Sequence, residues 1–158
     1  MSDIVVKDTF GIGINAQEEI TKYATFAIGG EMFGVNALNV QEIYSFQKMT
    51  KVPHSADYIL GLINLRGQIV TAIDLRYRLT NKNTEITEDS MNCILKTEQG
   101  ICSVIVDEIG DVMDISESNM EPPPETMDNK MKEYVSKICK LTDRLLCVLD
   151  IEKIVKVE

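Results

Sequence analysis

The sequence lacks most of the residues from which catalytic and metal sites are built. It contains no tryptophan, and His54 is its only histidine, so a site with two imidazoles is excluded. No G-x-S-x-G, P-loop or H-E-x-x-H motif occurs in it. Residues 11–16 fit the spacing G-x-G-x-x-A, but too few residues follow before the next strand pattern for the helix that this dinucleotide motif needs. We therefore expect a protein that is not an enzyme and that uses no cofactor.

Close pairs of cysteines are also absent. The four cysteines, Cys93, Cys102, Cys139 and Cys147, are far apart, and each has apolar neighbours. Zinc sites usually draw on close pairs of cysteine or histidine, and disulfides are rare in the cytoplasm. We expect four reduced, buried thiols that pack as small apolar side chains.

Basic residues and long apolar runs are scarce. The chain has 25 acidic and 16 basic residues and a net charge of −9, which disfavours nucleic acid and anionic membranes as partners. No apolar run approaches the ~20 residues of a membrane span, and the N-terminal residues lack the pattern of a secretory signal. The sequence therefore predicts a cytoplasmic protein without direct membrane insertion. The carboxylates of Asp107, Glu108, Asp111 and Asp114 are expected to point outward from a strand rather than to bind a cation.

Short β patterns dominate the rest of the chain. Residues 23–28 and 31–35 flank Gly29-Gly30, and residues 91–97 and 101–106 flank a loop that contains Gly100, so both pairs predict β-hairpins. Further strands are expected at 108–115, 134–141 and 145–150. A short helix or irregular turn is expected at 37–44, an extended connector at 116–125, and a helical turn at 151–155. Residues 1–20 are expected to form a mobile arm or an edge strand. The predicted class is mainly β, a barrel or sandwich with short helical elements.

The segment from Tyr58 to Arg76, YILGLINLRGQIVTAIDLR, is the most informative part of the chain. It sets Arg66 among apolar residues that resemble buried strand positions, namely Ile63, Leu65, Val70, Ile73 and Leu75. A charge in such a setting must be paired or must emerge at an edge. Glu42 is the predicted partner of Arg66. The pair is interpreted either as a structural ion pair or as part of a groove rim that recognises a partner, and the two interpretations are compatible.

This segment closely resembles the signature of the CheW-type chemotaxis coupling proteins. The match comprises Val52-Pro53, Tyr58-Ile59, Gly61, residues 63–67 and residues 73–76. The resemblance continues outside the signature and extends from about residue 23 to residue 157. It includes residues 33–35, 40–43, 106–108, 122–124 and 149–153.

The resemblance implies two small five-stranded SH3-like β-barrel subdomains, intertwined within residues 21–158 and packed on a shared hydrophobic core. It also implies an adaptor without catalytic activity, which joins methyl-accepting chemotaxis receptors, at their cytoplasmic tips, to the regulatory domain of the histidine kinase CheA. Such a protein is cytoplasmic and is recruited to membrane-associated receptor arrays. The alternative that we keep is a small-ligand-binding β-barrel unrelated to chemotaxis.

The same resemblance implies three groups of contact residues. The receptor-binding groove is expected at Val40, Glu42, Arg66, Ile109 and Val112. The kinase contact is expected at Leu38, Tyr58, Gly61 and Asn64, with a possible second kinase contact at Glu121, Pro122 and Thr126. Two departures from the family pattern stand out. Ser103 replaces a common glycine and is expected on a groove wall, and Glu121 and Thr126 replace a basic and an aromatic residue of some relatives.

Overall fold

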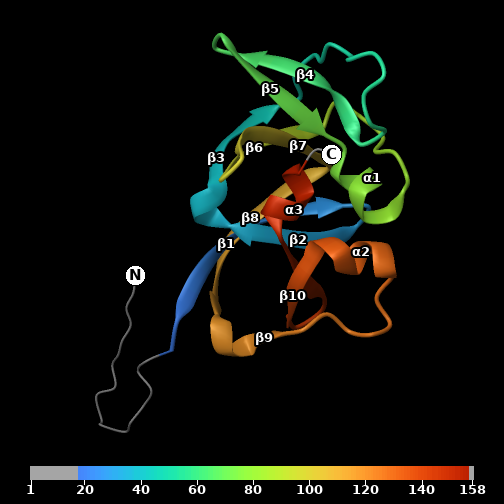
Figure 1. Ribbon diagram of the computed structural model, residues 1–158. Coiled ribbons are helices and arrows are strands. Elements are labelled where there is room, and N and C mark those ends of the chain that lie inside the picture. Colours follow the sequence, from blue (N-terminus) through green and yellow to red (C-terminus); the bar gives the residue numbers. More distant parts are fainter. Residues whose placement is uncertain (1–17, 157–158) are drawn as a thin grey trace, which may run out of the picture.

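The structure is a computed structural model that describes residues 18–156, and its strands form two twisted sheets (Figure 1). Sheet A has the strand order β8-β1-β2-β11-β10-β9, and sheet B has the order β3-β6-β7-β5-β4. The strands of sheet A are β8 (Glu108–Ser116), β1 (Ile20–Ile28), β2 (Glu31–Asn36), β11 (Leu145–Leu149), β10 (Val135–Lys140) and β9 (Met120–Glu121). Those of sheet B are β3 (Val40–Ser45), β6 (Met91–Thr97), β7 (Gly100–Val106), β5 (Gln68–Ile73) and β4 (Ile59–Leu65).

Both predicted hairpins are present. Strands β1 and β2 are joined by Gly29 and Gly30, whose φ angles of 60° and 84° favour glycine in a two-residue turn. Strands β6 and β7 pair in one register throughout, and Gly100, with φ 113°, follows their turn. The mainly β class is therefore confirmed. Within the described residues the strand order of each sheet ends at two edge strands, so hydrogen bonds close neither sheet into a barrel.

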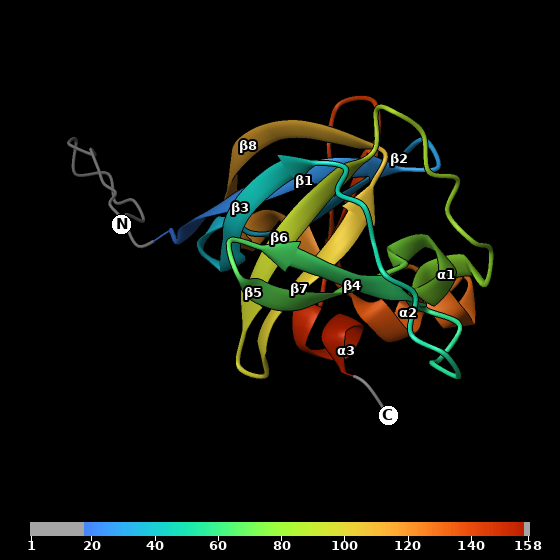
Figure 2. The same ribbon diagram turned by 90° about the horizontal axis from the view of Figure 1, so that it is seen from above.

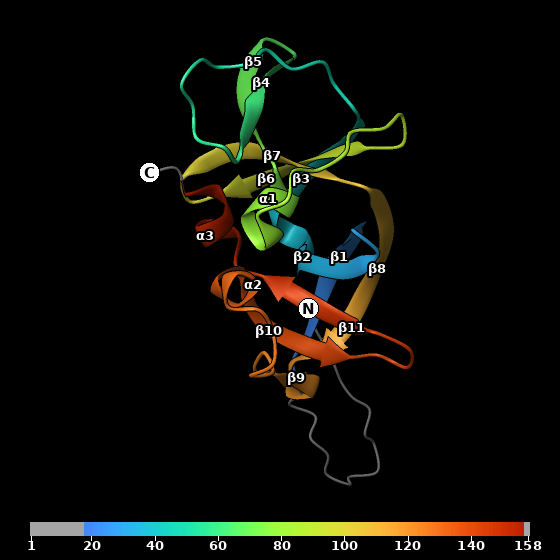
Figure 3. The same ribbon diagram turned by 90° about the vertical axis from the view of Figure 1, so that its right-hand side faces the viewer.

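The two sheets exchange one edge strand each (Figure 3). Strand β3 follows β2 through the 3₁₀ turn η1 (Ala37–Asn39), yet it leaves sheet A and pairs with β6 in sheet B. Strand β8 follows β7 and pairs with β1 in sheet A. Each sheet thus has one edge strand that directly follows, in the sequence, a strand of the other sheet. Neither sheet is therefore assembled from one continuous segment.

A structural repeat underlies this exchange. Strands β4 and β5 pair with a bulge between Ile59 and Gly61, and β10 and β11 pair with a bulge between Val135 and Lys137. Both second strands run parallel to a strand of a hairpin, β5 to β7 and β11 to β2. Each of these two hairpins is closed by an equivalent backbone hydrogen bond. The aspartate that follows β5 or β11 donates its N–H to the carbonyl of the tyrosine that precedes β4 or β10. The distance is 2.7 Å from Asp74 to Tyr58 and 2.8 Å from Asp150 to Tyr134.

The hydrophobic core lies mainly between the sheets. One large cluster, here called the shared core, draws on both sheets and includes Phe33, Val104 and Leu149. Two smaller clusters lie within the individual sheets, one around Leu146 in sheet A and one around Val70 in sheet B. Because the shared core takes side chains from both sheets, its burial stabilises them only together.

Three short helices complete the described chain. They are α1 (Leu75–Thr80), α2 (Asn129–Tyr134) and α3 (Ile151–Val155). The side chains of Asp74, Asp128 and Asp150 accept hydrogen bonds from backbone N–H groups of the first turns, as N-cap residues do. The predicted helical turn at 151–155 is confirmed by α3.

Several sequence expectations were wrong in detail. The expected helix or turn at 37–44 is helical only at η1, and β3 begins at Val40. Leu75 is buried as expected, but it begins α1 rather than continuing a strand. The expected strand at 134–141 begins at Val135, directly after α2, and the connector at 116–125 contains the turn η2 (Glu117–Asn119) and β9. Most of the predicted arm at 1–20 lies outside the described residues.

Gly61 fills a place that admits no side chain. It is buried within β4 beside a bulge, and its φ angle of 154° lies where side chains are rarely found. A Cβ atom there would lie 2.6 Å from the carbonyl oxygen of Thr50. Thr50 is held in place by two backbone hydrogen bonds with Leu62, each of 2.8 Å. A side chain at position 61 would therefore have to displace the backbone at Thr50.

We expect Gly61→Ala to destabilise the protein by about 2–3 kcal/mol, because it adds both a backbone clash and a strained φ angle. Gly67→Ala is the matched control. Gly67 has a φ angle of 85° but open space around its Cα, so we expect a loss of only about 1–2 kcal/mol. Chemical denaturation followed by circular dichroism measures both, and equal losses in the two variants would contradict the close approach to Thr50.

Candidate functional site

The signature arginine occupies the turn between β4 and β5. Arg66 and Gly67 have φ angles of 55° and 85°, and the side-chain oxygen of Asn64 accepts the Gly67 N–H at 2.9 Å. Two successive positive φ angles are typical of a tight hairpin turn. The turn lifts the Arg66 side chain out of the apolar strand and leaves it 75% exposed. The charge thus emerges at an edge, which was one of the two expected solutions.

The other expected solution, a charge partner, is present as well. A guanidinium nitrogen of Arg66 lies 3.1 Å from a carboxylate oxygen of Glu42 on β3. The other oxygen of that carboxylate accepts a hydrogen bond from the Tyr44 hydroxyl, and the guanidinium lies 5.8 Å from the centre of the Tyr44 ring. We call these three residues the Arg66 cluster. It links the edge strand β3 to the β4–β5 turn.

The Arg66 cluster borders a small cavity of about 90 Å³. Its other lining residues are Gln41 and Gln68 and the apolar Leu65, Val70, Ile94 and Ile101. A planar guanidinium and a carboxylate beside apolar side chains offer both charge and contact area to a partner. The site is therefore suited to recognition rather than to covalent chemistry.

The other residues of the predicted receptor groove lie on the two exchanged strands. Val40 on β3 and Ile109 on β8 both pack against the shared core, and Val112 on β8 is 59% exposed. Figure 2 shows β3 and β8 on the same side of the molecule. The structure brings Glu42 and Arg66 into contact. Val40 lies on the same strand as Glu42, whereas Ile109 and Val112 lie on the other exchanged strand, β8.

The residues of the predicted kinase contact are not all surface residues. Leu38 on η1 is 84% exposed, and Asn64 is exposed near the β4–β5 turn. Tyr58 is half-buried against the shared core, and Gly61 is buried. Asn64 and Tyr58 lie toward opposite ends of β4, and η1, which carries Leu38, is anchored to β6 by the hydrogen bond from Asn39 to the Lys96 carbonyl.

The predicted second kinase contact is exposed. Glu121 ends β9 and lies 3.6 Å from Lys140, whereas Pro122 and Thr126 are exposed in the following loop. Next to β9, the carboxylate of Glu117 lies 2.8 Å from Lys137 and accepts the Tyr23 hydroxyl hydrogen bond at 2.8 Å. Burial raises the pKa of Glu117, but the hydrogen bonds from Lys137 and Tyr23 outweigh it and keep the pKa below its ordinary value.

Ser103 was expected on a groove wall, and this expectation was wrong. The side chain is fully buried between strands, and its hydroxyl donates to the side-chain oxygen of Asn92 at 3.1 Å. Asn92, also fully buried, donates to the carbonyl of Ser45 at 3.4 Å. The pair joins β7, β6 and β3 inside the protein, so Ser103 cannot contact a partner directly.

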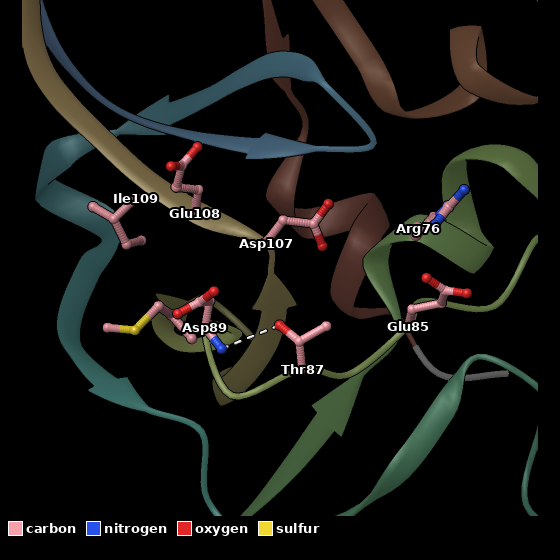
Figure 4. A pocket seen from close by; sticks show the side chains of 8 residues that line it. Arg76, Glu85, Thr87, Asp89, Asp107, Glu108 and Ile109 are labelled. Carbon is pink, nitrogen blue, oxygen red and sulfur yellow. Dashed lines mark hydrogen bonds between the residues drawn. The ribbon is translucent and has the colours of Figure 1, made fainter.

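A larger cavity of about 510 Å³ lies between α1, the loop before β6 and the start of β8 (Figure 4). Its lining carries four carboxylates, one guanidinium, one hydroxyl and two apolar side chains. The lining residues are Arg76, Glu85, Thr87, Asp89, Met91, Asp107, Glu108 and Ile109. Asp107 accepts the Gly29 N–H at 2.8 Å, and the Thr87 hydroxyl accepts the Asp89 N–H at 3.1 Å.

Residues 18–156 contain neither a candidate metal site nor a candidate membrane-spanning helix. Within that range no three histidine, cysteine or acidic side chains gather closely enough to hold a metal ion. None of the helices in the same range has the length and apolar character to cross a bilayer.

All four thiols are buried, as the sequence predicted. Burial raises the pKa of Cys93 and of Cys102 to about 12 and that of Cys147 to about 11. Since the thiolate is the reactive form of cysteine, these side chains are poor nucleophiles in the folded protein.

We therefore expect the native protein at pH 8 to react with a disulfide reagent such as DTNB only at the rate of unfolding. The same protein in guanidinium chloride should titrate all four thiols at once. Rapid stoichiometric labelling of native protein would show that at least one thiol is accessible, contrary to the packing described above.

Comparison with known proteins identifies a family for this fold. Residues 22–158 match the family described as CheW-like domain. A chemotaxis protein CheW of Bacillus subtilis is 35% identical over 129 residues, 82% of this chain and 83% of the relative. A chemotaxis protein CheW of Klebsiella aerogenes is 31% identical over 137 residues, 87% of this chain and 82% of the relative.

A solved structure agrees with these matches. The crystal structure of the scaffolding protein TtCheW from Thermoanaerobacter tengcongensis is similar with a TM-score of 0.74 at 30% sequence identity. The similarity covers 84% of this chain and 90% of that protein. Sequence and fold thus lead to the same family.

Proposed function

The chain belongs to the CheW-like family, and from that premise we propose that it is a chemotaxis adaptor that joins methyl-accepting chemoreceptors to the histidine kinase CheA. The observation that carries the proposal is the Arg66 cluster, in which the family signature itself forms an exposed turn paired with Glu42. A guanidinium held at a rim and backed by apolar side chains is a common recognition device. The proposed activity is therefore binding, without turnover of a substrate, in the cytoplasm at receptor arrays.

The proposed receptor surface combines the Arg66 cluster with the exchanged strands. It comprises Val40, Glu42, Arg66, Ile109 and Val112. The exposed Val112 supplies an apolar anchor at one edge, and the exposed Arg66 supplies a charge at the other. Receptor tips that present both apolar and acidic side chains would be complementary to this surface. No feature of the described residues favours the alternative, a barrel that holds a small ligand.

The proposed kinase surface rests on Leu38 and Tyr58, with Asn64 at the β4–β5 turn. Among residues 18–156, Leu38 is the most exposed of the large apolar side chains. A large apolar side chain left in water on a rigid turn is a natural anchor for a partner. The loop with Glu121, Pro122 and Thr126 offers a second, separate surface for the same kinase. We assign no direct contact to Gly61, which supports β4 from within.

The first binding prediction concerns the charge pair. Arg66→Glu should weaken receptor binding about tenfold or more, because it places a like charge beside Glu42 and removes the guanidinium. The free energy of unfolding should change by no more than about 1 kcal/mol, because the pair is exposed. Calorimetric titration with a soluble receptor hairpin and thermal unfolding measure the two effects. Arg144→Glu is the control, since the Arg144–Asp143 pair, at 3.5 Å, is an exposed pair outside the proposed receptor surface.

The second binding prediction concerns Leu38. Leu38→Glu should weaken binding of the CheA regulatory domain about tenfold, because loss of a buried apolar anchor costs about 1–2 kcal/mol. Its effect on folding should be small, since the side chain is exposed in the free protein. Ile86→Glu, at another exposed apolar residue, serves as the control. If Leu38→Glu and wild type bind the kinase domain equally well, the kinase surface lies elsewhere.

A further inference from the structure

Arg78 is a buried charge whose partners come from both halves of the repeat. It lies on α1 and is only 7% exposed. Its guanidinium carbon stacks 3.6 Å from the centre of the Tyr58 ring and lies 5.6 Å from that of Tyr134. One terminal nitrogen donates to the Tyr134 hydroxyl at 3.1 Å, and the other donates to the backbone carbonyl of Lys156.

No carboxylate among residues 18–156 forms an ion pair with Arg78. Its Nε atom is buried and has no hydrogen-bond partner there. The acceptors of Arg78 among these residues are a hydroxyl and a backbone carbonyl. A buried guanidinium held by neutral acceptors is costly, and evenly packed apolar side chains of similar size are often as stable. The cost indicates that the position needs a property that an apolar residue does not provide.

That property is the planar fork of arginine. The fork stacks on one ring while it donates to two acceptors, and lysine offers neither the plane nor the fixed geometry. Tyr58 and Tyr134 are equivalent in the repeat, since the carbonyl of each accepts the N–H of a helix-capping aspartate. Arg78 therefore fixes the ring of Tyr58, at the start of β4, relative to α2 and the end of α3.

We propose that Arg78 is a positioning residue for the kinase contact, which it serves by holding the ring of Tyr58 in its binding orientation. This inference rests on the proposed function, in which Tyr58 belongs to the kinase surface. Arg78 itself is buried and does not touch the kinase. The Arg66 cluster is formed by β3 and by the β4–β5 turn, at the end of β4 opposite to Tyr58, so we expect the receptor surface not to depend on Arg78.

The first test reports on Tyr58 without any partner. The chain has five tyrosines, so incorporation of 3-fluorotyrosine gives a fluorine NMR spectrum in which Tyr58→Phe identifies the Tyr58 signal. Arg78→Lys should shift and broaden that signal, because the stacked guanidinium is lost. Arg76→Lys, two residues away on the same helix, is the matched control and should leave the signal unchanged.

The second test measures binding by calorimetric titration. Arg78→Lys should weaken binding of the CheA regulatory domain about tenfold, the size of a desolvated cation–π contact, and leave receptor-hairpin affinity unchanged. Combined with Tyr58→Leu, it should cause no further loss, because it acts through Tyr58. Tyr134→Phe removes only one of the two acceptors of the Arg78 guanidinium, so it should cause a smaller loss of kinase affinity. This variant provides the test if Arg78→Lys does not fold.

The outcomes separate the two proposals. If wild type fails to bind the kinase domain, the proposed function is wrong and the positioning role falls with it. If wild type binds, but Arg78→Lys leaves both the Tyr58 signal and the affinity unchanged, only the positioning role is overturned. Additive losses in the double variant, or an equal loss of receptor and kinase binding, would show a general structural role and would likewise overturn it.

Discussion

The exchange of β3 and β8 between the two sheets is the constraint on which the rest of the structure depends. The backbone hydrogen bonds of β3 are made with β6, and those of β8 with β1, so the edge of each sheet is formed by chain from the other half. Long-range pairing of this kind makes the folding unit cooperative. The edge strand that carries Glu42 therefore forms only when both halves are folded. The Arg66 cluster, in turn, forms only in the complete domain.

The two hairpins of the repeat differ at their turns. Hairpins β4–β5 and β10–β11 have equivalent bulges, and β5 and β11 each run parallel to a strand of another hairpin. The turns have diverged in sequence, since one carries Arg66-Gly67 and the other Asp143-Arg144. We infer that this divergence gives the β4–β5 turn the charge that the proposed receptor surface uses, while the shared core holds both hairpins in a fixed relation.

Much of the fold could be predicted from the sequence, because hairpins with glycine turns and apolar strands have local signals. Strand β3 could not, because it is an edge strand whose alternate side chains, such as Gln41 and Ser45, are exposed and polar or small. Helices α1 and α2 are too short to show a helical period. The buried state of Ser103 and the close approach at Gly61 depend on Asn92 and Thr50, which are distant in sequence, and no local pattern identifies such pairs.

The candidate site could be predicted in part for the same reason. The unusual setting of Arg66 and its pairing with Glu42 followed from one charge in an apolar segment. By contrast, no local pattern in the sequence showed that Tyr58 packs against the shared core or that Gly61 is buried. Arg78 was missed altogether, because its stacking partners Tyr58 and Tyr134 become visible as a pair only once the repeat is known.

An adaptor must hold both partners at once, and a co-sedimentation experiment tests this most directly. Receptor signalling domains displayed on vesicles, the CheA kinase and this protein would be mixed, and the kinase in the pellet would be measured with and without this protein. The account predicts that the kinase sediments with the vesicles in an amount that rises with this protein and then saturates. Kinase sedimentation that is independent of this protein, or that falls as it is added, would contradict the account.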